Sequence, residues 1–119
     1  MQVREALYAV LKAIPALSKM PIRPLVAQPA DKPPYVVYTQ ISGQRVKSLA
    51  GDSGLANPHI QIDVYAADIV LAGDLQKAIR DAVLASPVLG AVHLDEGDGY
   101  EPEAKLYRCR QDFSLWVYD

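Results

Sequence analysis

Residues 59–66 read HIQIDVYA, the clearest run of alternating apolar and polar side chains in the chain. The even positions are apolar and the odd positions are polar or amphipathic: Ile60, Ile62 and Val64 against His59, Gln61, Asp63 and Tyr65. Successive side chains of a strand point to opposite faces of the sheet. The alternation therefore predicts a strand with one buried face and one exposed face.

Two further segments alternate with the same period, namely residues 34–43 (PYVVYTQISG) and residues 100–119 (YEPEAKLYRCRQDFSLWVYD). They predict a strand at 35–41 and a final strand near the C-terminus. In the final strand the odd positions are predicted to be buried and the even positions exposed: Tyr107, Cys109, Phe113, Leu115 and Val117 against Arg108, Arg110, Asp112 and Ser114. Trp116 and Tyr118 share the even face, where aromatic side chains indicate either an interface or a second core layer.

Two segments have helical periodicity instead. Residues 1–13 place apolar side chains at a spacing of three and four, and Pro15 marks the end of this first helix. Asp68 is the predicted N-cap of a second helix, which ends before Pro87. The predicted buried stripe of the second helix consists of Leu71, Leu75, Ala78, Ile79, Ala82 and Val83.

The connections differ in composition. Residues 16–34 contain five prolines, which favours an extended connection. Residues 43–57 (GQRVKSLAGDSGLAN) are polar and contain glycine, so we expect a long loop, and residues 95–104 are expected to form an acidic loop after a short strand at 91–94. Loops of this length in a compact domain are usually functional or disordered.

The resulting order is helix, strand, strand, helix, strand, strand. It predicts an α+β domain over residues 1–119, with an antiparallel-dominated four-stranded sheet and two helices packed on one face. The opposite face of such a sheet is left for a partner.

Composition narrows the class of protein. The chain of 119 residues is 50% hydrophobic and 22% charged, which is typical of a globular domain that needs no disulfide or metal. A net charge of −2 argues against sequence-specific binding to nucleic acid. The single cysteine, Cys109, falls on the apolar face and is predicted to be buried. Because no apolar run reaches the length of a signal peptide or a membrane span, we expect no membrane partner and synthesis in a cytoplasm.

The residues needed for catalysis are missing. His59 and His93 are the only side chains with an ordinary pKa near neutrality, and neither belongs to a recognisable motif. The acidic residues at 95–103 lack the ligand spacing of a dedicated calcium site. We therefore expect no enzyme activity, no metal and no cofactor.

The order of these segments resembles the tail completion or tail terminator family of long-tailed bacteriophages, whose members join tail to head. The likeness covers nearly the whole chain. It is carried by residues 34–38 (PYVVY), 61–66 (QIDVYA) and 100–102 (YEP), followed by residues 106–108 (LYR) and 112–113 (DF).

The resemblance implies a structural protein of the virion. It would form a ring of six copies on the distal end of the growing tail tube, stop tube polymerisation, and present the joining surface for the head. Its implied partners are further copies of itself, the major tail tube protein, and the head connector or head-closure protein. Its implied location is the head–tail junction, after assembly in the host cytoplasm. The alternative is a generic, non-enzymatic α+β binding or regulatory module of a bacterial complex.

Charged and aromatic residues outside the predicted core are the candidates for an assembly interface. A head-to-tail ring needs two different complementary patches on each subunit, which suits two long segments of opposite charge. For both segments a simply solvated surface is the alternative. The candidates are Arg45, Lys47 and Asp52 in the long loop, Asp95, Glu96 and Asp98 in the acidic loop, and Arg108, Arg110 and Trp116 in the final strand.

Overall fold

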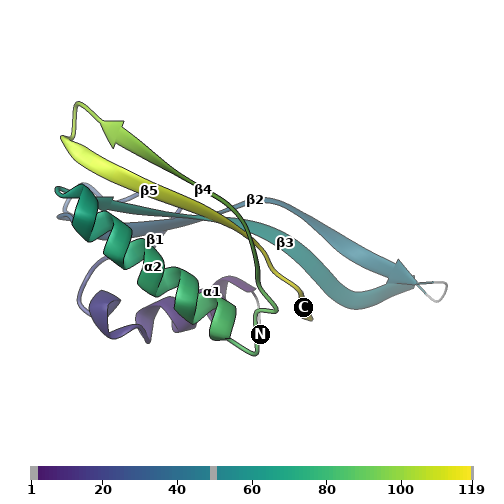
Figure 1. Ribbon diagram of the computed structural model, residues 1–119. Coiled ribbons are helices and arrows are strands. Elements are labelled where there is room, and N and C mark those ends of the chain that lie inside the picture. Colours follow the sequence, from purple (N-terminus) through teal and green to yellow (C-terminus); the bar gives the residue numbers. More distant parts are fainter. Residues whose placement is uncertain (1–2, 49–50, 119) are drawn as a thin grey trace.

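The computed structural model describes residues 3–48 and 51–118, and residues 46–48 and 51–53 are described by their backbone alone. The described residues form an α+β fold with two α-helices, one short 3-10 helix and six strands (Figure 1). The elements in chain order are α1 (Val3–Lys12), η1 (Pro15–Leu17), β1 (Ile22–Pro24), β2 (Tyr35–Ser48), β3 (Gly51–Ala66), α2 (Ile69–Ala85), β4 (Val92–Glu101), β5 (Leu106–Ser114) and β6 (Val117–Tyr118).

The strands form a single sheet in the order β1-β2-β3-β5-β4, and β6 pairs with β3 beyond the end of β5. β1 is parallel to β2, and the other pairings are antiparallel. The prediction of four strands is therefore wrong. β1 comes from the proline-rich connection, where Pro24 is tolerated because the strand lies at the edge of the sheet. The final segment divides into β5 and β6, because the backbone of Trp116 leaves the ladder and donates to Leu89 O at 2.9 Å.

Both helices lie on one face of the sheet, as the sequence predicts (Figure 1). The N-cap prediction is also confirmed, since the Asp68 side chain accepts a hydrogen bond from the amide of Val70 at 3.1 Å. Between the helices and the sheet lies one core, and its largest fully buried side chains include Leu7, Leu11, Leu17, Ile60, Ile62, Ile79, Leu89, Phe113 and Leu115. The predicted alternation of β3 holds for Ile60, Ile62 and Val64, and Cys109, Phe113, Leu115 and Val117 of the final segment are buried as predicted. Tyr107, predicted to be buried, is exposed instead, and its ring lies beside Tyr100 with the centroids 4.9 Å apart, while Ser114, predicted to be exposed, is buried.

The buried face of α2 is rotated from the predicted stripe. Leu71 is exposed, whereas Ala72 and Gln76 are buried. Gln76 is accommodated because its Nε2 donates to the backbone oxygen of Arg110 at 2.9 Å, while Gln111 Nε2 donates to the backbone oxygen of Gln76 at 2.9 Å. A pair of glutamines therefore ties α2 to β5, and apolar periodicity alone cannot identify such a contact.

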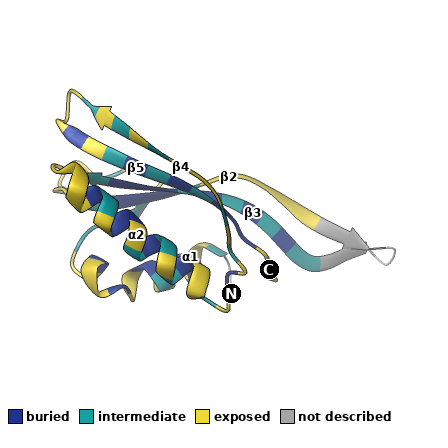
Figure 2. Cartoon of the chain, in the orientation of Figure 1, coloured by how far each residue is buried: buried dark blue, intermediate teal, exposed yellow. Residues whose placement is uncertain are grey.

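The prediction of a long loop at residues 43–57 is wrong, because β2 continues to Ser48 and β3 begins at Gly51. β2 and β3 remain paired through Gly43↔Pro58, Arg45↔Ala56 and Lys47↔Asp52, and they project from the body as a long hairpin (Figure 1). We call residues 43–57 the hairpin arm. It gives the molecule its long axis, in a shape of 52 × 26 × 25 Å. Apolar periodicity does not reveal these strands because the arm covers almost none of the core, and the described arm residues of β2 are exposed (Figure 2).

Residues 95–104 are not an acidic loop either. β4 extends to Glu101, and a short turn leads into β5. The sequence does not predict this strand because it has no buried face. β4 is the last strand of the sheet, and most of its side chains are exposed. Acidic side chains on an edge strand hinder unwanted pairing with other chains.

Candidate assembly surfaces

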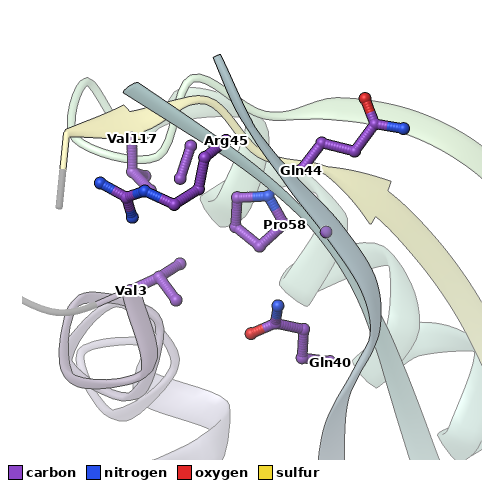
Figure 3. A pocket seen from close by; sticks show the side chains of 8 residues that line it. Val3, Gln40, Gln44, Arg45, Pro58 and Val117 are labelled. Carbon is purple, nitrogen blue, oxygen red and sulfur yellow. The ribbon is translucent and has the colours of Figure 1, made fainter. Parts of the chain in front are cut away.

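The base of the hairpin arm is joined to the body around a cavity of about 260 Å³ (Figure 3). Val3 of α1, Gln40 and Arg45 of β2, and Pro58 of β3 line it. A Cβ atom on Gly43 would lie 2.8 Å from Gln40 Nε2 and 3.3 Å from Pro58 Cα, so glycine permits this close packing. Arg45 thus lines the cavity at the base of the arm, in register with Ala56 of β3.

Two further candidates lie nearer the tip of the arm. Lys47 and Asp52 face each other in register across β2 and β3, while their side chains lie outside the described part of the structure. The three arm candidates therefore share one hairpin.

The three acidic candidates of β4 do not form one patch. The carboxylate of Asp95 lies 3.5 Å from Arg110 Nη2 on the face of the sheet opposite the helices, which we call the open face. Glu96 Oε1 lies 3.4 Å from Arg80 Nη1 of α2, on the helix side. The neighbouring strand β5 brings the thiol of Cys109 to 3.5 Å from Asp98 Oδ1.

Cys109 is buried, as the sequence predicts. Burial, with the nearby carboxylate of Asp98 adding to it, raises the pKa of the Cys109 thiol to about 11. The thiol is therefore protonated and unreactive near neutral pH.

The arginines of β5 and the carboxylates around them form a charged network on the open face. Arg110 contacts Asp112 at 2.8 Å and Asp95 at 3.5 Å, so one guanidinium bridges carboxylates on two strands. Arg108 lies 3.9 Å from a carboxylate oxygen of Glu101. The structure thus brings three of the predicted candidates, Asp95, Arg108 and Arg110, onto one surface.

Two glycines, which the sequence patterns do not single out, make this network possible. A Cβ on Gly97 would lie 2.9 Å from Arg110 Nη2, and a Cβ on Gly99 would lie 3.2 Å from Arg108 Nε. Each arginine therefore lies across a glycine of the neighbouring strand β4. In the sequence DEGDG at residues 95–99, the two glycines are two positions apart, as residues on one face of a strand are. Without knowledge of the strand, the same sequence is typical of a flexible loop.

Asp63 lies in the same network, where the sequence predicts an exposed residue. Its side chain is 5% exposed and accepts a hydrogen bond from Gln61 Nε2 at 3.0 Å, while Oδ1 has no hydrogen-bond partner within the described ranges. Burial raises the pKa of the Asp63 carboxyl, and the positive charges of Arg108 and Arg110 oppose that rise. The open face thus contains a carboxylate that is shielded from solvent and incompletely hydrogen-bonded.

Trp116 lies apart from this network. It is exposed, and the Gly90 backbone packs against it, since a Cβ there would lie 2.7 Å from the Trp116 carbonyl oxygen. Its neighbour Tyr118 is also exposed. The two aromatic side chains therefore mark a separate surface near the end of α2.

The two histidines contact side chains of the fold, an asparagine and a phenylalanine. His59 Nε2 lies 3.2 Å from Asn57 Oδ1, and the His93 ring packs edge-on against Phe113 with the ring centroids 5.3 Å apart. Within residues 3–48 and 51–118 we find no group of three potential metal-ligating side chains. Neither described helix combines the length and apolar character needed to cross a bilayer.

Comparison with known proteins agrees with the observed fold. A sequence model of the family described as Tail completion protein gp17 matches residues 5–118. A chain from a solved structure titled "Virion of native gene transfer agent (GTA) particle" is similar in fold, with a TM-score of 0.78 and 22% sequence identity over 98% of this chain and 95% of that chain. A search of curated proteins finds no match.

Proposed function

Because the chain belongs to the tail completion protein gp17 family, we propose that it forms a ring on the end of a phage-type tail tube, ends tube polymerisation and presents the surface that receives the head connector. The family match over residues 5–118 carries this proposal. The ring has six copies, and its partners are the major tail tube protein and the head connector or head-closure protein. The action is geometric, with no covalent bond made or broken.

The shape of the subunit supports a ring built head to tail. The hairpin arm leaves the body at one end, while β4 forms the edge of the sheet and pairs there with no other strand of the described chain. Contacts between two different surfaces repeat from copy to copy and close into a ring when the rotation allows it. An isologous contact, in which both copies use the same surface, would instead stop at a dimer.

We place the contact between the arm of one copy and the open face of the next. The arm contributes Arg45 and Lys47, and the β4 edge contributes Asp95 on the open face together with Glu96 and Asp98, which lie on the other side of the same strand. Single exposed ion pairs contribute only about 0–1 kcal/mol, but a contact repeated around a ring gains through multivalency. An edge strand also offers backbone groups to a partner's backbone.

A charge reversal tests the proposed contact. The double variant R45E/K47E should leave the melting temperature of the monomer nearly unchanged, because Arg45 is exposed and the arm covers little of the core. It should lower the yield of joined particles, so that free heads and free or overlong tails accumulate in electron micrographs. A matched control is K12E/K77E, which makes the same charge change at exposed positions of the two helices.

The outcomes separate the proposed surfaces. If R45E/K47E joins heads to tails as well as the parent does, the charges of the arm are not part of the mechanism, and the surfaces at Arg108, Arg110 and Trp116 become the next candidates. Electron microscopy of tails assembled without the protein tests the function itself. Tails of normal length that join to heads in its absence would contradict the proposal.

A further inference from the structure

A second cavity, of about 250 Å³, lies at the opposite end of β2 and β3 from the hairpin arm. Its walls include Tyr35 and Val37 of β2, Asp63 and Tyr65 of β3, and the segment Leu25–Val26 that follows β1. Tyr35 and Tyr65 form the last register pair at this end, and Ser48 and Gly51 form the last pair at the tip of the arm. We call this cavity the tyrosine pocket.

The chemistry of the tyrosine pocket suits a cationic side chain. The rings of Tyr35 and Tyr65 stack with centroids 5.1 Å apart, and Asp63, whose charge is partly offset by Arg108 and Arg110 of β5, has one buried oxygen without a hydrogen-bond partner in the described chain. Aromatic rings attract ammonium and guanidinium groups, and a carboxylate forms strong hydrogen bonds with them. Burying a carboxylate that lacks a hydrogen-bond partner lowers the stability of the fold unless a donor reaches it.

The rim of the pocket is apolar and strained. Leu25 and Val26 are 69% and 70% exposed, and Leu25 adopts a φ of 69°, which a leucine rarely takes. The amide of Val26 donates to Pro24 O at 2.8 Å, so the strain is held in a three-residue turn. Strained backbone at a surface points to a binding role. The methylene stem of a lysine or arginine would cover such a rim.

We propose that the tyrosine pocket receives a basic side chain from the hairpin arm of a second copy, so that each arm anchors in the next subunit of the ring. This inference rests on the proposed ring. The arm is the occupant that the chain itself offers, since residues 43–57 contain Arg45 and Lys47 against Asp52 and carry a net charge of +1. The arm and the pocket also lie at opposite ends of the 52 Å axis, as a head-to-tail contact requires.

The contact cannot form within one copy. Arg45 is in register with Ala56, and Tyr65 lies nine positions further along β3 (56 to 65). At the rise of a strand this separation is roughly 30 Å. A covalent link between the arm and the pocket must therefore join two copies.

Disulfide trapping exploits this separation. We would make R45C/Y65C and K47C/Y65C in the full chain, with Y35C as a second pocket position, and oxidise assembled particles. The native Cys109 should not interfere, because it is buried and its thiol pKa is about 11. We expect a ladder of linked copies on non-reducing gels from at least one pairing. The control R45C/K77C, which uses an exposed position on α2, should give none.

Electron microscopy of the same samples separates the two proposals. Rings that contain the variants but give no ladder from any pairing would overturn the pocket inference and leave the ring intact. Absence of rings in the parent protein would overturn the proposed function and the inference with it.

The variant Asp63→Asn gives an independent measurement. It removes the charge from the pocket in an almost identical shape, so we expect the melting temperature of the monomer to stay the same or rise while self-association weakens at least about tenfold. The control D74N removes a carboxylate at an exposed position of α2, outside both proposed surfaces, and should leave association nearly unchanged. Unchanged association in D63N, or a parallel fall of melting temperature and association, would contradict the inference.

Discussion

At the scale of single residues, Asp63 differs most from its sequence-based interpretation. The alternation of β3 assigns it to the exposed face, and it does lie on the open face, yet it is only 5% exposed. It lines one pocket with Tyr35 and Tyr65, and the charges of Arg108, Arg110 and Asp112 on β5 act on it. Being on the open face of this sheet is therefore not equivalent to being in solvent.

The buried carboxyl gives a pH-dependent prediction. Burial raises the pKa of Asp63, with Asp112 adding to the rise and Gln61, Arg108 and Arg110 opposing it. A raised pKa in the folded state means that this group favours folding below its unfolded pKa, and the contribution is lost as pH rises through the folded pKa. Asparagine has no such titration. The gain in melting temperature of D63N over the parent should therefore be largest at pH 7 and shrink toward pH 4.

Thermal melts of monomeric parent and D63N between pH 4 and pH 7 measure this difference. A gain that stays constant across the range, or grows as the pH falls, would show that the Asp63 pKa is not raised. D95N, measured in parallel, reports how charge removal at an exposed carboxylate of the same face behaves.

A second prediction compares one substitution at two isoleucines. Ile62 is 0% exposed in the core and Ile41 is 50% exposed on β2. Ile62→Asp buries an unpaired carboxylate and should lower the free energy of unfolding by several kcal/mol, about 3 or more, whereas Ile41→Asp should cost less than about 1 kcal/mol. Chemical denaturation measures both. Equal costs would mean that the register of β3 is wrong.

At the scale of elements, α2 is attached to the sheet by polar contacts as well as by apolar packing. The side chain of Gln76 bonds to the β5 backbone, and the side chain of Gln111 bonds to the α2 backbone. These two reciprocal hydrogen bonds fix the rotation of α2, which is why Leu71 faces solvent although it continues the apolar pattern.

Removing one member of this pair should destabilise the domain. Gln76→Ala eliminates the hydrogen bond to the Arg110 carbonyl and leaves a small cavity, with an expected loss of about 1–3 kcal/mol in the free energy of unfolding. Lys77→Ala, next to it on the exposed side of α2, should change stability by less than about 0.5 kcal/mol. Urea titrations of the two variants test the difference, and comparable losses would argue against the glutamine contacts.

At the scale of the whole molecule, the body and the hairpin arm have separate tasks. The core is formed by the two helices and the paired strands of the body, and Ala56 is the one arm residue among its described members. Stability should therefore reside in the body, and assembly should depend on the arm.

Shortening the arm tests this division. Replacing residues 45–56 with Asn-Gly, a sequence that favours a tight hairpin turn, joins the register pair Gln44 and Asn57 and should keep the monomer folded with a melting temperature within a few degrees of the parent. Ring formation and head joining should be lost. Circular dichroism follows the first property and electron microscopy the second. Rings formed by the shortened protein would exclude the arm as the joining element, and an unfolded product would show that the body depends on it.

The elements that pack their side chains into the core can be predicted from the sequence alone. α1, the N-cap of α2, and the buried faces of β3 and β5 all follow from periodicity, because burial on one side imposes the spacing of apolar residues. The order of the segments was also enough to indicate the tail completion family, which the match over residues 5–118 confirms.

The exposed elements and the pairing of charges were decided only by the tertiary structure. The hairpin arm and β4 carry no apolar alternation, so their sequences resemble loops although their backbones are paired. Asp95 and Arg110, 15 positions apart in the sequence, meet because β4 and β5 are in register and Gly97 leaves room for the guanidinium. Asp63 is buried because side chains from other strands cover it. Which residues become neighbours in space depends on strand register, and register depends on the whole sheet.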